Sequence, residues 1–489
     1  MTHAAAAAAT ASRLLALAFL AACGSGAPRP LPDLSPAEIQ LREQLGIPLD
    51  AEQVVFFGQS SHLDLDWQHT FDDYDRLYVE DLLHQATDVL SSQPRATYSI
   101  AEMAFLQRHL ALHPEEAAPL RAAAARGALH VVGGGMTSPD TLLPETELLA
   151  RDYLDGLAFA EETLGVRPTA AWLPDSFGHG AATPDLLAAA GFTSVGMARI
   201  DGAPGLLDLV HDPAAPPLPG STADLLRTAG SADFVWKGSG GATILAHYLA
   251  GSGLYCQGDN LDYSEPFEPA GGHLGAFDDS PAFTDASIDR YVRELTPYAR
   301  TRNLFVPVGC DFAAPKAALV AYLDGYDRRR YPTTHVWAVD ASFETYEQFL
   351  ALHADALPVI DHELSPYFMG FYGSRAAIKR GVRDAARPFW VAETFATLLG
   401  AEGAARVAAA RPALALLTRA DHHDFITGTS TDDVVTGEQL PLLATAQAAG
   451  EAAERDLADA IGRRIAPPAD LRGRFLALDA ASAAERGAV

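Results

Sequence analysis

The sequence predicts an α/β protein with a mostly parallel sheet, either open or closed into a barrel. Short apolar segments alternate along the chain with longer amphipathic patterns that are typical of helices, and four of the apolar segments run directly into polar clusters. Of the 489 residues, 48% are hydrophobic and 20% are charged. This composition supports a sizeable buried core and excludes a wholly disordered chain.

Each strand is predicted from a short apolar run bounded by polar residues or glycine. The expected strands are Val54–Phe57, Ala96–Ile100, Leu129–Val132, Ala170–Leu173, Thr193–Met197 and Asn303–Val308. Helices are expected over 78–93 and 144–164, and Gly165 is a suitable stop for the second. After about Asp361 the pattern becomes helical, with one apolar stripe formed by Val391, Phe395, Leu398 and Leu399.

Charge and cysteine content exclude several classes of protein. The net charge of −28 argues against binding to nucleic acid or to anionic lipid, which repel a polyanion. The three cysteines, Cys23, Cys256 and Cys310, are too few for a disulfide framework or a thiolate zinc finger.

The N-terminus has the features of an export signal. Arg13 precedes an apolar run that is too short to span a bilayer and ends in small residues. Leu20-Ala21-Ala22-Cys23 resembles a bacterial lipobox, which implies a signal peptide over 1–22, lipidation of Cys23 and a linker over 23–44. The protein is then exported and lipid-anchored on the periplasmic or cell-surface side, with no other membrane contact. The alternative is an ordinary signal peptide with an incidental cysteine.

Two His/Asp clusters indicate a metal site. His62 and Asp64 follow the first strand two residues apart, so in an extended segment both side chains point to the same side. A second cluster, His422-His423-Asp424, follows an apolar helix. Imidazole and carboxylate ligands together suit a borderline or hard divalent metal.

Four motifs, in this order along the chain, resemble those of the family 38 glycoside hydrolases, the retaining α-mannosidases. They are His62-Leu63-Asp64-Leu65-Asp66-Trp67, Trp172-Leu173-Pro174-Asp175-Ser176-Phe177-Gly178-His179, Gly309-Cys310-Asp311-Phe312 and His422-His423-Asp424-Phe425-Ile426-Thr427-Gly428-Thr429. The similarity covers about residues 52–450. It implies a (β/α) barrel-like catalytic domain over 45–358 and a three-helix bundle over 359–465. Residues 466–489 would then be the start of the family's missing β-rich domains, or a flexible tail.

The resemblance also implies roles for individual residues. One Zn²⁺ per chain would be bound by His62, Asp64, Asp175 and His423. Asp175 would be the nucleophile and Asp311 the general acid/base of a double-displacement reaction. Sugar-binding residues would be Trp67, Phe177, Arg199, Tyr255 and Asp424. Cys310 stands where the family often has a second acid.

Two functional interpretations therefore remain. The first is an exported, zinc-dependent retaining α-mannosidase that acts on mannose-containing glycans or oligosaccharides. The second is a truncated or catalytically weak relative that binds mannosides. A third candidate, a zinc polysaccharide deacetylase, is suggested by Thr70-Phe71-Asp72-Asp73 with His109 and His113, but it leaves the other motifs unexplained. The alternative to the deacetylase is that His109 and His113 are two exposed residues of an ordinary amphipathic helix.

Overall fold

The computed structural model describes residues 33–202, 216–264, 267–268, 272–273 and 275–464. The predicted signal peptide, Cys23 and the segment 466–489 lie outside these residues. The chain forms two compact units, 1–52 and 53–489. In the first unit, helix α2 (Pro36–Leu45) occupies residues that the sequence predicts as part of a linker. Ser35 caps this helix, because its side chain accepts a hydrogen bond from the Glu38 amide.

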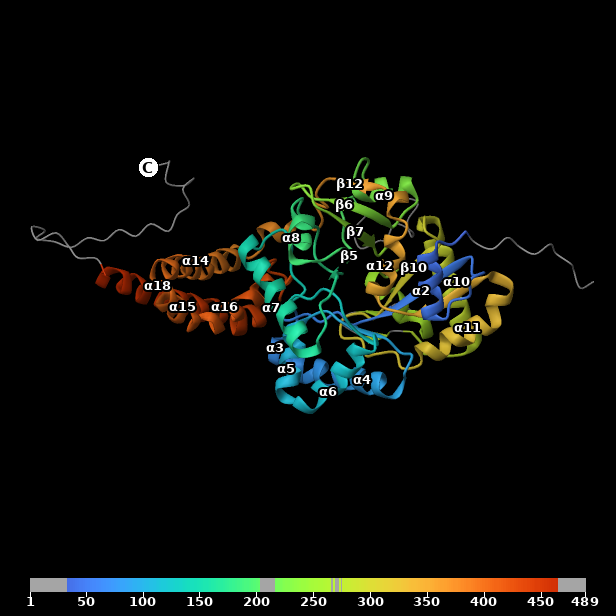
Figure 1. The fold of residues 1–489 in the computed structure, drawn as a ribbon, viewed down its shortest axis with the longest axis horizontal. Helices are drawn as coiled ribbons and strands as arrows, with labels where there is room; N and C mark the ends of the chain where they lie inside the picture. The colour runs from blue at the N-terminus through green and yellow to red at the C-terminus, as the bar shows by residue number, and fades with distance from the viewer. Residues whose placement is uncertain (1–32, 203–215, 265–266, 269–271, 274, 465–489) are drawn as a thin grey trace, which may run out of the picture. The chain divides into compact units, whose positions relative to one another are not determined.

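The second unit has an α/β fold with mostly parallel strands, as the sequence predicts (Figure 1). In one sheet, β1 (Gln53–Gln59) lies between β10 (Asn303–Val308) and β11 (Val336–Asp340), and both pairings are parallel. β2 (Tyr98–Ile100) and β3 (Leu129–Val131) form a separate parallel pair. All of β1 beyond its first residue is buried, which explains its uninterrupted apolar sequence.

A five-stranded sheet has the order β12-β6-β7-β5-β4. Its strands are β4 (Ala170–Leu173), β5 (Ser194–Met197), β6 (Asp233–Lys237), β7 (Thr243–Tyr248) and β12 (Val359–Ile360). Only the β6–β7 pairing in it is antiparallel. β8 (Phe267–Glu268) and β9 (Gly272–His273) form a short antiparallel pair. The sheets are hydrogen-bonded separately within the described residues, so closure into one barrel stays a prediction.

Helices connect and cover these strands. The helix predicted over 144–164 is α7 (Thr146–Leu164), and it ends at Gly165 with a φ of 75° in the left-handed region. The other helices outside the C-terminal region are α3 (Phe71–Tyr74), α4 (Glu80–Ser92), α5 (Met103–Leu112), α6 (Ala117–Ala125), α8 (Thr183–Ala190), α9 (Thr222–Ala229), α10 (Pro281–Leu295), α11 (Leu319–Thr334) and α12 (Phe343–Ala351). A π-helical turn, Asp75–Val79, joins α3 to α4.

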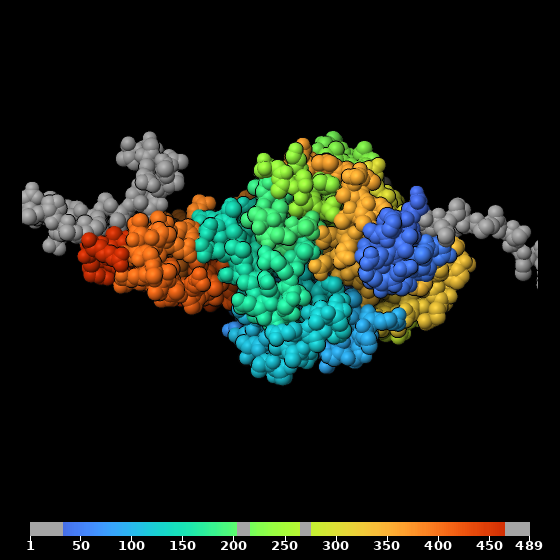
Figure 2. Space-filling view, in the orientation of Figure 1, coloured from blue at the N-terminus to red at the C-terminus, as the bar shows by residue number. Residues whose placement is uncertain are grey.

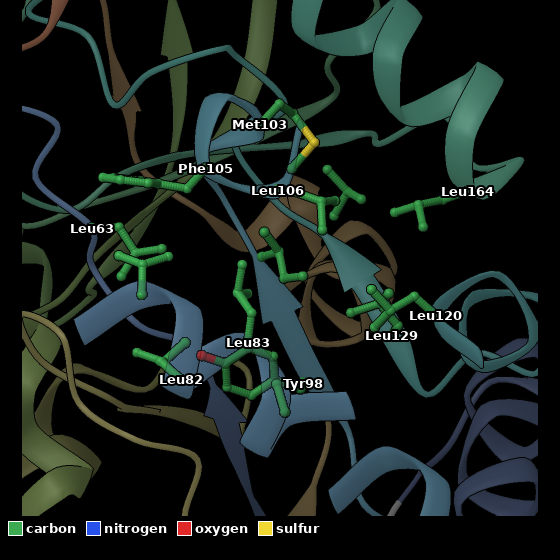
Figure 3. Close-up of a cluster of buried hydrophobic side chains, with 14 of the residues drawn as sticks. Leu63, Leu82, Leu83, Tyr98, Met103, Phe105, Leu106, Leu120, Leu129 and Leu164 are labelled. Atoms are coloured by element: carbon green, nitrogen blue, oxygen red, sulfur yellow. The ribbon is translucent and has the colours of Figure 1, made fainter. Parts of the chain in front are cut away.

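One apolar core lies beneath α4, α5 and α6. Figure 3 shows Leu82 and Leu83 of α4, Met103, Phe105 and Leu106 of α5 and Leu120 of α6 converging on the β2–β3 pair. Leu63, from the segment that follows β1, belongs to the same cluster. The core therefore anchors the backbone between His62 and Asp64.

The C-terminal part is helical, as expected. Two long helices, α14 (Ala376–Leu399) and α18 (Leu440–Arg464), pack along each other, and two short ones, α15 (Ala401–Ala408) and α16 (Arg411–Leu417), accompany them. The smaller elements here are α13 (Gly370–Gly373) and α17 (Asp432–Val434). None of the described helices is both long and apolar enough to cross a membrane.

The predicted apolar stripe on α14 is correct except at one position. Phe395 and Leu399 are buried against Leu457 and Ile461 of α18, and Val391 packs on the same cluster. Leu398 is 64% exposed, so its assignment to the stripe is wrong. Residues 391, 395 and 399 repeat every four positions on one face, whereas residue 398 is turned about 100° from residue 399.

The helical region is packed against the rest of this unit. Leu148 of α7 belongs to the same core cluster as Ile378 and Phe389 of α14. Figure 2 shows the orange and red atoms of the helices adjoining the teal atoms of the α7 region. This contact brings the turn after α16, which carries the second His/Asp cluster, to the strand ends of the α/β region.

Candidate active site

Main-chain contacts hold His62 and Asp311 side by side where β1 and β10 end. The His62 amide donates to the Cys310 carbonyl at 3.2 Å, and the Phe312 amide donates to the His62 carbonyl at 3.0 Å. Gly309 has a φ of 136°, and a Cβ there would lie 1.6 Å from the Ser60 carbonyl oxygen. Only glycine fits this close approach of the two chain segments.

Four predicted ligands converge at this point. The Asp64 Oδ1 atom lies 3.0 Å from His62 Nε2 and 3.3 Å from His423 Nε2. The two imidazole Nε2 atoms are 3.3 Å apart. His423 Nε2 is also 3.6 Å from Asp175 Oδ2. The structure thus brings close together His62, Asp64, Asp175 and His423, which lie up to about 360 residues apart in the sequence. They fall into three overlapping groups, each able to hold a metal ion: His62, Asp175 and His423; His62, Asp64 and Asp311; and Asp64, His422, His423 and Asp424.

Charge in this cluster favours a cation. Burial lowers the pKa of His423, but the Asp424 and Asp64 carboxylates outweigh that effect and raise the pKa to about 9. Burial raises the pKa of Asp64, and the neighbouring His62 and His423 more than reverse this and lower it. A divalent metal would take the place of the imidazole protons, because metal ligands must be deprotonated.

The adjacent residues His422 and His423 make different contacts. His423 donates from Nδ1 to the Ser138 carbonyl at 2.8 Å, which turns Nε2 toward the carboxylates. The Leu65 amide donates a hydrogen bond to Nε2 of His422, and Nδ1 of His422 lies 2.9 Å from Asp66 Oδ1. Burial lowers the pKa of His422 to about 3. Both nitrogens of this neutral imidazole therefore contact protein groups, although His422 also belongs, with Asp64, His423 and Asp424, to a group whose ligand atoms lie within 4.8 Å of one another.

Two buried carboxyls support the site and were not assigned a role from the sequence. Glu102 follows β2, and its Oε1 atom lies 3.7 Å from His62 Nδ1, the nitrogen that faces away from Asp64. Burial raises the pKa of Glu102 to about 7. Asp66 accepts from Gln439 at 2.9 Å, and burial raises its pKa to about 8. Glu102 therefore lies behind His62, where a carboxyl group commonly orients a ligating ring, and Asp66 contacts the ring of His422.

Asp175 is the most accessible member of the cluster, with 16% of its side chain exposed. Arg199 forms an ion pair with the Asp175 carboxylate, and its Nε donates to the Asp175 carbonyl at 3.2 Å. Three aromatic rings surround the guanidinium at 5.2–5.7 Å: Phe177, Tyr367 and Phe368. Arg199, predicted to bind sugar, is thus engaged with Asp175. The sequence pattern had not indicated Tyr367 or Phe368.

Asp311 lies in a protected environment. Burial, together with the Asp64 charge, raises the pKa of Asp311 to about 6, as a general acid requires. The Tyr255 hydroxyl donates to Asp311 Oδ1 at 3.1 Å. The next residue along the chain from Tyr255, Cys256, forms a disulfide with Cys310, the residue before Asp311. One bridge therefore joins the two segments that carry this hydrogen bond.

Two predicted sugar-binding residues lie at the edge of the cluster. Asp424 has its Oδ2 atom 3.6 Å from His423 Nε2, and the Thr429 hydroxyl donates to its Oδ1 atom. Trp67 is half-buried against the core beneath α4 and α5, and its carbonyl accepts from the Thr431 amide at 3.0 Å. Trp67 thus lies between this core and the turn after His423.

The match to a known family covers most of this architecture. Residues 52–369 match the N-terminal domain of the glycosyl hydrolases family 38. The chain belongs to this family. The epididymis-specific alpha-mannosidase of Sus scrofa is 25% identical over 409 residues, which are 77% of this chain and 39% of the relative. The lysosomal alpha-mannosidase of Dictyostelium discoideum is 23% identical over 360 residues, 66% of this chain and 32% of that relative.

The fold is also similar to a solved structure of the family. An alpha-mannosidase from Enterococcus faecalis V583 superposes with a TM-score of 0.68 at 16% identity, over 84% of this chain and 43% of that one. The chain thus spans well under half the length of these relatives. At such identity the superposition establishes the fold alone.

Proposed function

We propose that this chain is a zinc-dependent retaining α-mannosidase that removes terminal α-mannosides from glycans or oligosaccharides. The observation that carries this proposal is the meeting of overlapping groups of histidines and carboxylates that could hold a metal ion with a carboxyl group of raised pKa, Asp311, at the ends of β1 and β10. The relatives named above are alpha-mannosidases, which supports mannose as the sugar.

Ligand spacing supports zinc as the metal. Zinc-bound nitrogen and oxygen atoms, each about 2.0–2.2 Å from a tetrahedral ion, lie about 3.3–3.6 Å from one another. His62 Nε2, His423 Nε2 and Asp64 Oδ1 lie 3.0–3.3 Å from one another, and Asp175 Oδ2 lies 3.6 Å from His423 Nε2. When bound there, zinc would act as a Lewis acid toward sugar hydroxyl groups and stabilise a distorted ring.

The two carboxyls have different environments, and this difference supports a division of roles. Asp175, ionised beside Arg199, would attack the anomeric carbon and form a covalent glycosyl–enzyme intermediate. Asp311, protonated through its raised pKa, would give its proton to the leaving oxygen and then accept one from the attacking water. Tyr255 would hold the Asp311 carboxyl in place through both steps.

Export is part of the proposal, and the Cys256–Cys310 disulfide supports it. Disulfides form and persist in oxidising compartments and are rare in the cytosol. We infer that the protein is exported and anchored to a bacterial membrane through Cys23, whose neighbourhood resembles a lipobox.

The test is hydrolysis of an aryl α-mannoside by the zinc-loaded chain, with the aryl β-mannoside and the aryl α-glucoside as matched controls. We expect turnover of the α-mannoside alone, and NMR should detect the α-anomer of mannose as the first product. Release of the β-anomer would contradict the retaining mechanism. Binding of the α-mannoside without any turnover would favour the alternative, a catalytically weak mannoside-binding relative.

A further inference from the structure

A second cluster of histidines and carboxylates lies away from the candidate active site. It is formed where α4 packs against α5 and the 3₁₀ turn Pro114–Glu116, among the blue and cyan helices of Figure 1. Two pairs with i,i+4 spacing face each other: Glu80 and His84 on α4, and His109 and His113 at the end of α5. Glu116 completes the cluster.

The structure contradicts one expectation for these residues. His109 is only 1% exposed, so it is not a surface histidine, because it lies between α5 and the turn that carries Glu116. The deacetylase pattern is not assembled either. In the described residues Asp72 pairs with Arg108 and Asp73 with Arg76, whereas the two histidines meet a different set of groups.

Hydrogen bonds already bring the ligand atoms together. One Glu116 oxygen contacts His84 Nδ1, and the other lies 3.0 Å from His109 Nε2. His113 Nε2 is 3.1 Å from Glu80 Oε1. Two groups that share His84 each have their ligand atoms within 4.8 Å of one another. The first consists of His84, His109 and Glu116, and the second of Glu80, His84 and His113.

The three imidazole rings have the spacing of a metal centre. Their centroids are 4.9 Å apart for His84 and His109, 4.5 Å for His84 and His113, and 4.9 Å for His109 and His113. A zinc ion about 2.0–2.1 Å from each ligating nitrogen, with tetrahedral angles, sets imidazole centres about 5 Å apart. An arrangement of three histidines and one carboxylate is a typical borderline-metal ligand set.

We propose that His84, His109, His113 and Glu116 form a second metal site, which binds a divalent zinc-type ion and joins α4 to the end of α5. Glu116 is the carboxylate ligand because it contacts two of the three imidazoles, whereas Glu80 contacts one and orients His113. The Thr87 hydroxyl donates to Glu116 Oε2 at 2.7 Å and fixes that carboxylate. The site is structural, because its ligands come from α4, the end of α5 and the 3₁₀ turn Pro114–Glu116, and none belongs to the catalytic cluster.

The experiment counts zinc per chain in the purified full-length protein and follows thermal unfolding. We expect two equivalents in the unaltered chain and one in each of His84→Gln and His113→Gln, the two ligating histidines that are partly exposed. Both variants should keep turnover of the aryl α-mannoside, and added zinc should raise their unfolding temperature less than that of the unaltered chain. His423→Ala should also bind one equivalent, but it should lose turnover.

The matched control is His130→Gln. His130 is a half-buried histidine whose Nδ1 lies 3.0 Å from Glu344, so this variant breaks a His–Glu pair outside both clusters. It should keep two equivalents. One equivalent in the unaltered chain, or two in His84→Gln and His113→Gln, would overturn the second site and would show that the cluster is a hydrogen-bonded network without metal. Failure of the proposed catalytic site has a different signature, which is retention of both equivalents in His423→Ala.

Discussion

The Tyr255 hydroxyl donates a 3.1 Å hydrogen bond to Oδ1 of Asp311, from a segment 56 residues earlier in the chain. A donor to the charged form of a carboxyl favours ionisation, so this bond lowers the pKa of Asp311 while burial and the Asp64 charge raise it to about 6. The protonation state of the proposed acid therefore depends on this contact.

The first prediction concerns pH. Because Asp311 must be protonated to act as an acid, kcat/KM for substrates with poor leaving groups should fall as pH rises above about 6. Tyr255→Phe removes the donor that favours the carboxylate, so this falling limb should move to higher pH. The measurement is a pH profile of kcat/KM for both forms. A limb that stays in place, or moves to lower pH, would refute the role of Tyr255.

The second prediction concerns the disulfide between Cys256 and Cys310. Opening it should destabilise the fold by about 2–5 kcal/mol, as is typical for native bridges, and should loosen the segments that carry Tyr255 and Asp311. We expect Cys256→Ser to show a lower kcat and a lower unfolding temperature. The alternative single variant, Cys310→Ser, serves as the control and should have the same effect. Unchanged kcat in both would show that the bridge does not position the acid.

The third prediction separates the two carboxyls. Asp311→Ala should lose about 10²–10⁴-fold in rate on substrates with poor leaving groups and much less on activated aryl mannosides in the first step, because these leave without a proton. Asp175→Ala should lose activity on all of them, since no covalent intermediate can form. Steady-state and burst kinetics across a leaving-group series test this. Equal losses in both variants on every substrate would refute this division of roles between Asp175 and Asp311.

The fourth prediction uses the two adjacent histidines. His423→Ala should release the catalytic zinc and abolish turnover, because His423 Nε2 faces Asp64 and Asp175. His422→Ala should lower stability by about 1–3 kcal/mol, the cost of leaving the Leu65 amide and Asp66 without their partner, with zinc still bound. Metal analysis and thermal unfolding distinguish the two. Zinc loss in His422→Ala but not in His423→Ala would show that His422, and not His423, is the zinc ligand.

Much of the site could be predicted because its residues follow apolar strands or a recognisable turn. Val54–Phe57 and Asn303–Val308 are buried throughout, so their apolar runs mark the strands that carry His62 and Asp311. Glu102 has the same signal, since it follows the strand Tyr98–Ile100 after one residue. The same reasoning about strand ends could have identified it.

Other features have no local signal. Tyr367 and Phe368 lie in an irregular segment, and their role depends on packing around Arg199, which is about 170 residues away in sequence. The pairing of Cys256 with Cys310 depends on the fold, which brings η3 (Leu254–Asp262) to the end of β10. β12 (Val359–Ile360) has only two residues, too few for the pattern of a strand to stand out in the sequence. Long-range packing determines all three.

The most direct test of the account is turnover of an aryl α-mannoside before and after removal of bound metal. The chain is stripped with a chelator, dialysed, assayed, and assayed again after zinc is added back, with zinc content measured at each stage. We predict that turnover falls to background in the stripped protein and returns with zinc. Turnover that persists in protein shown to contain no metal, or that is absent from the zinc-loaded chain, would contradict a zinc-dependent α-mannosidase.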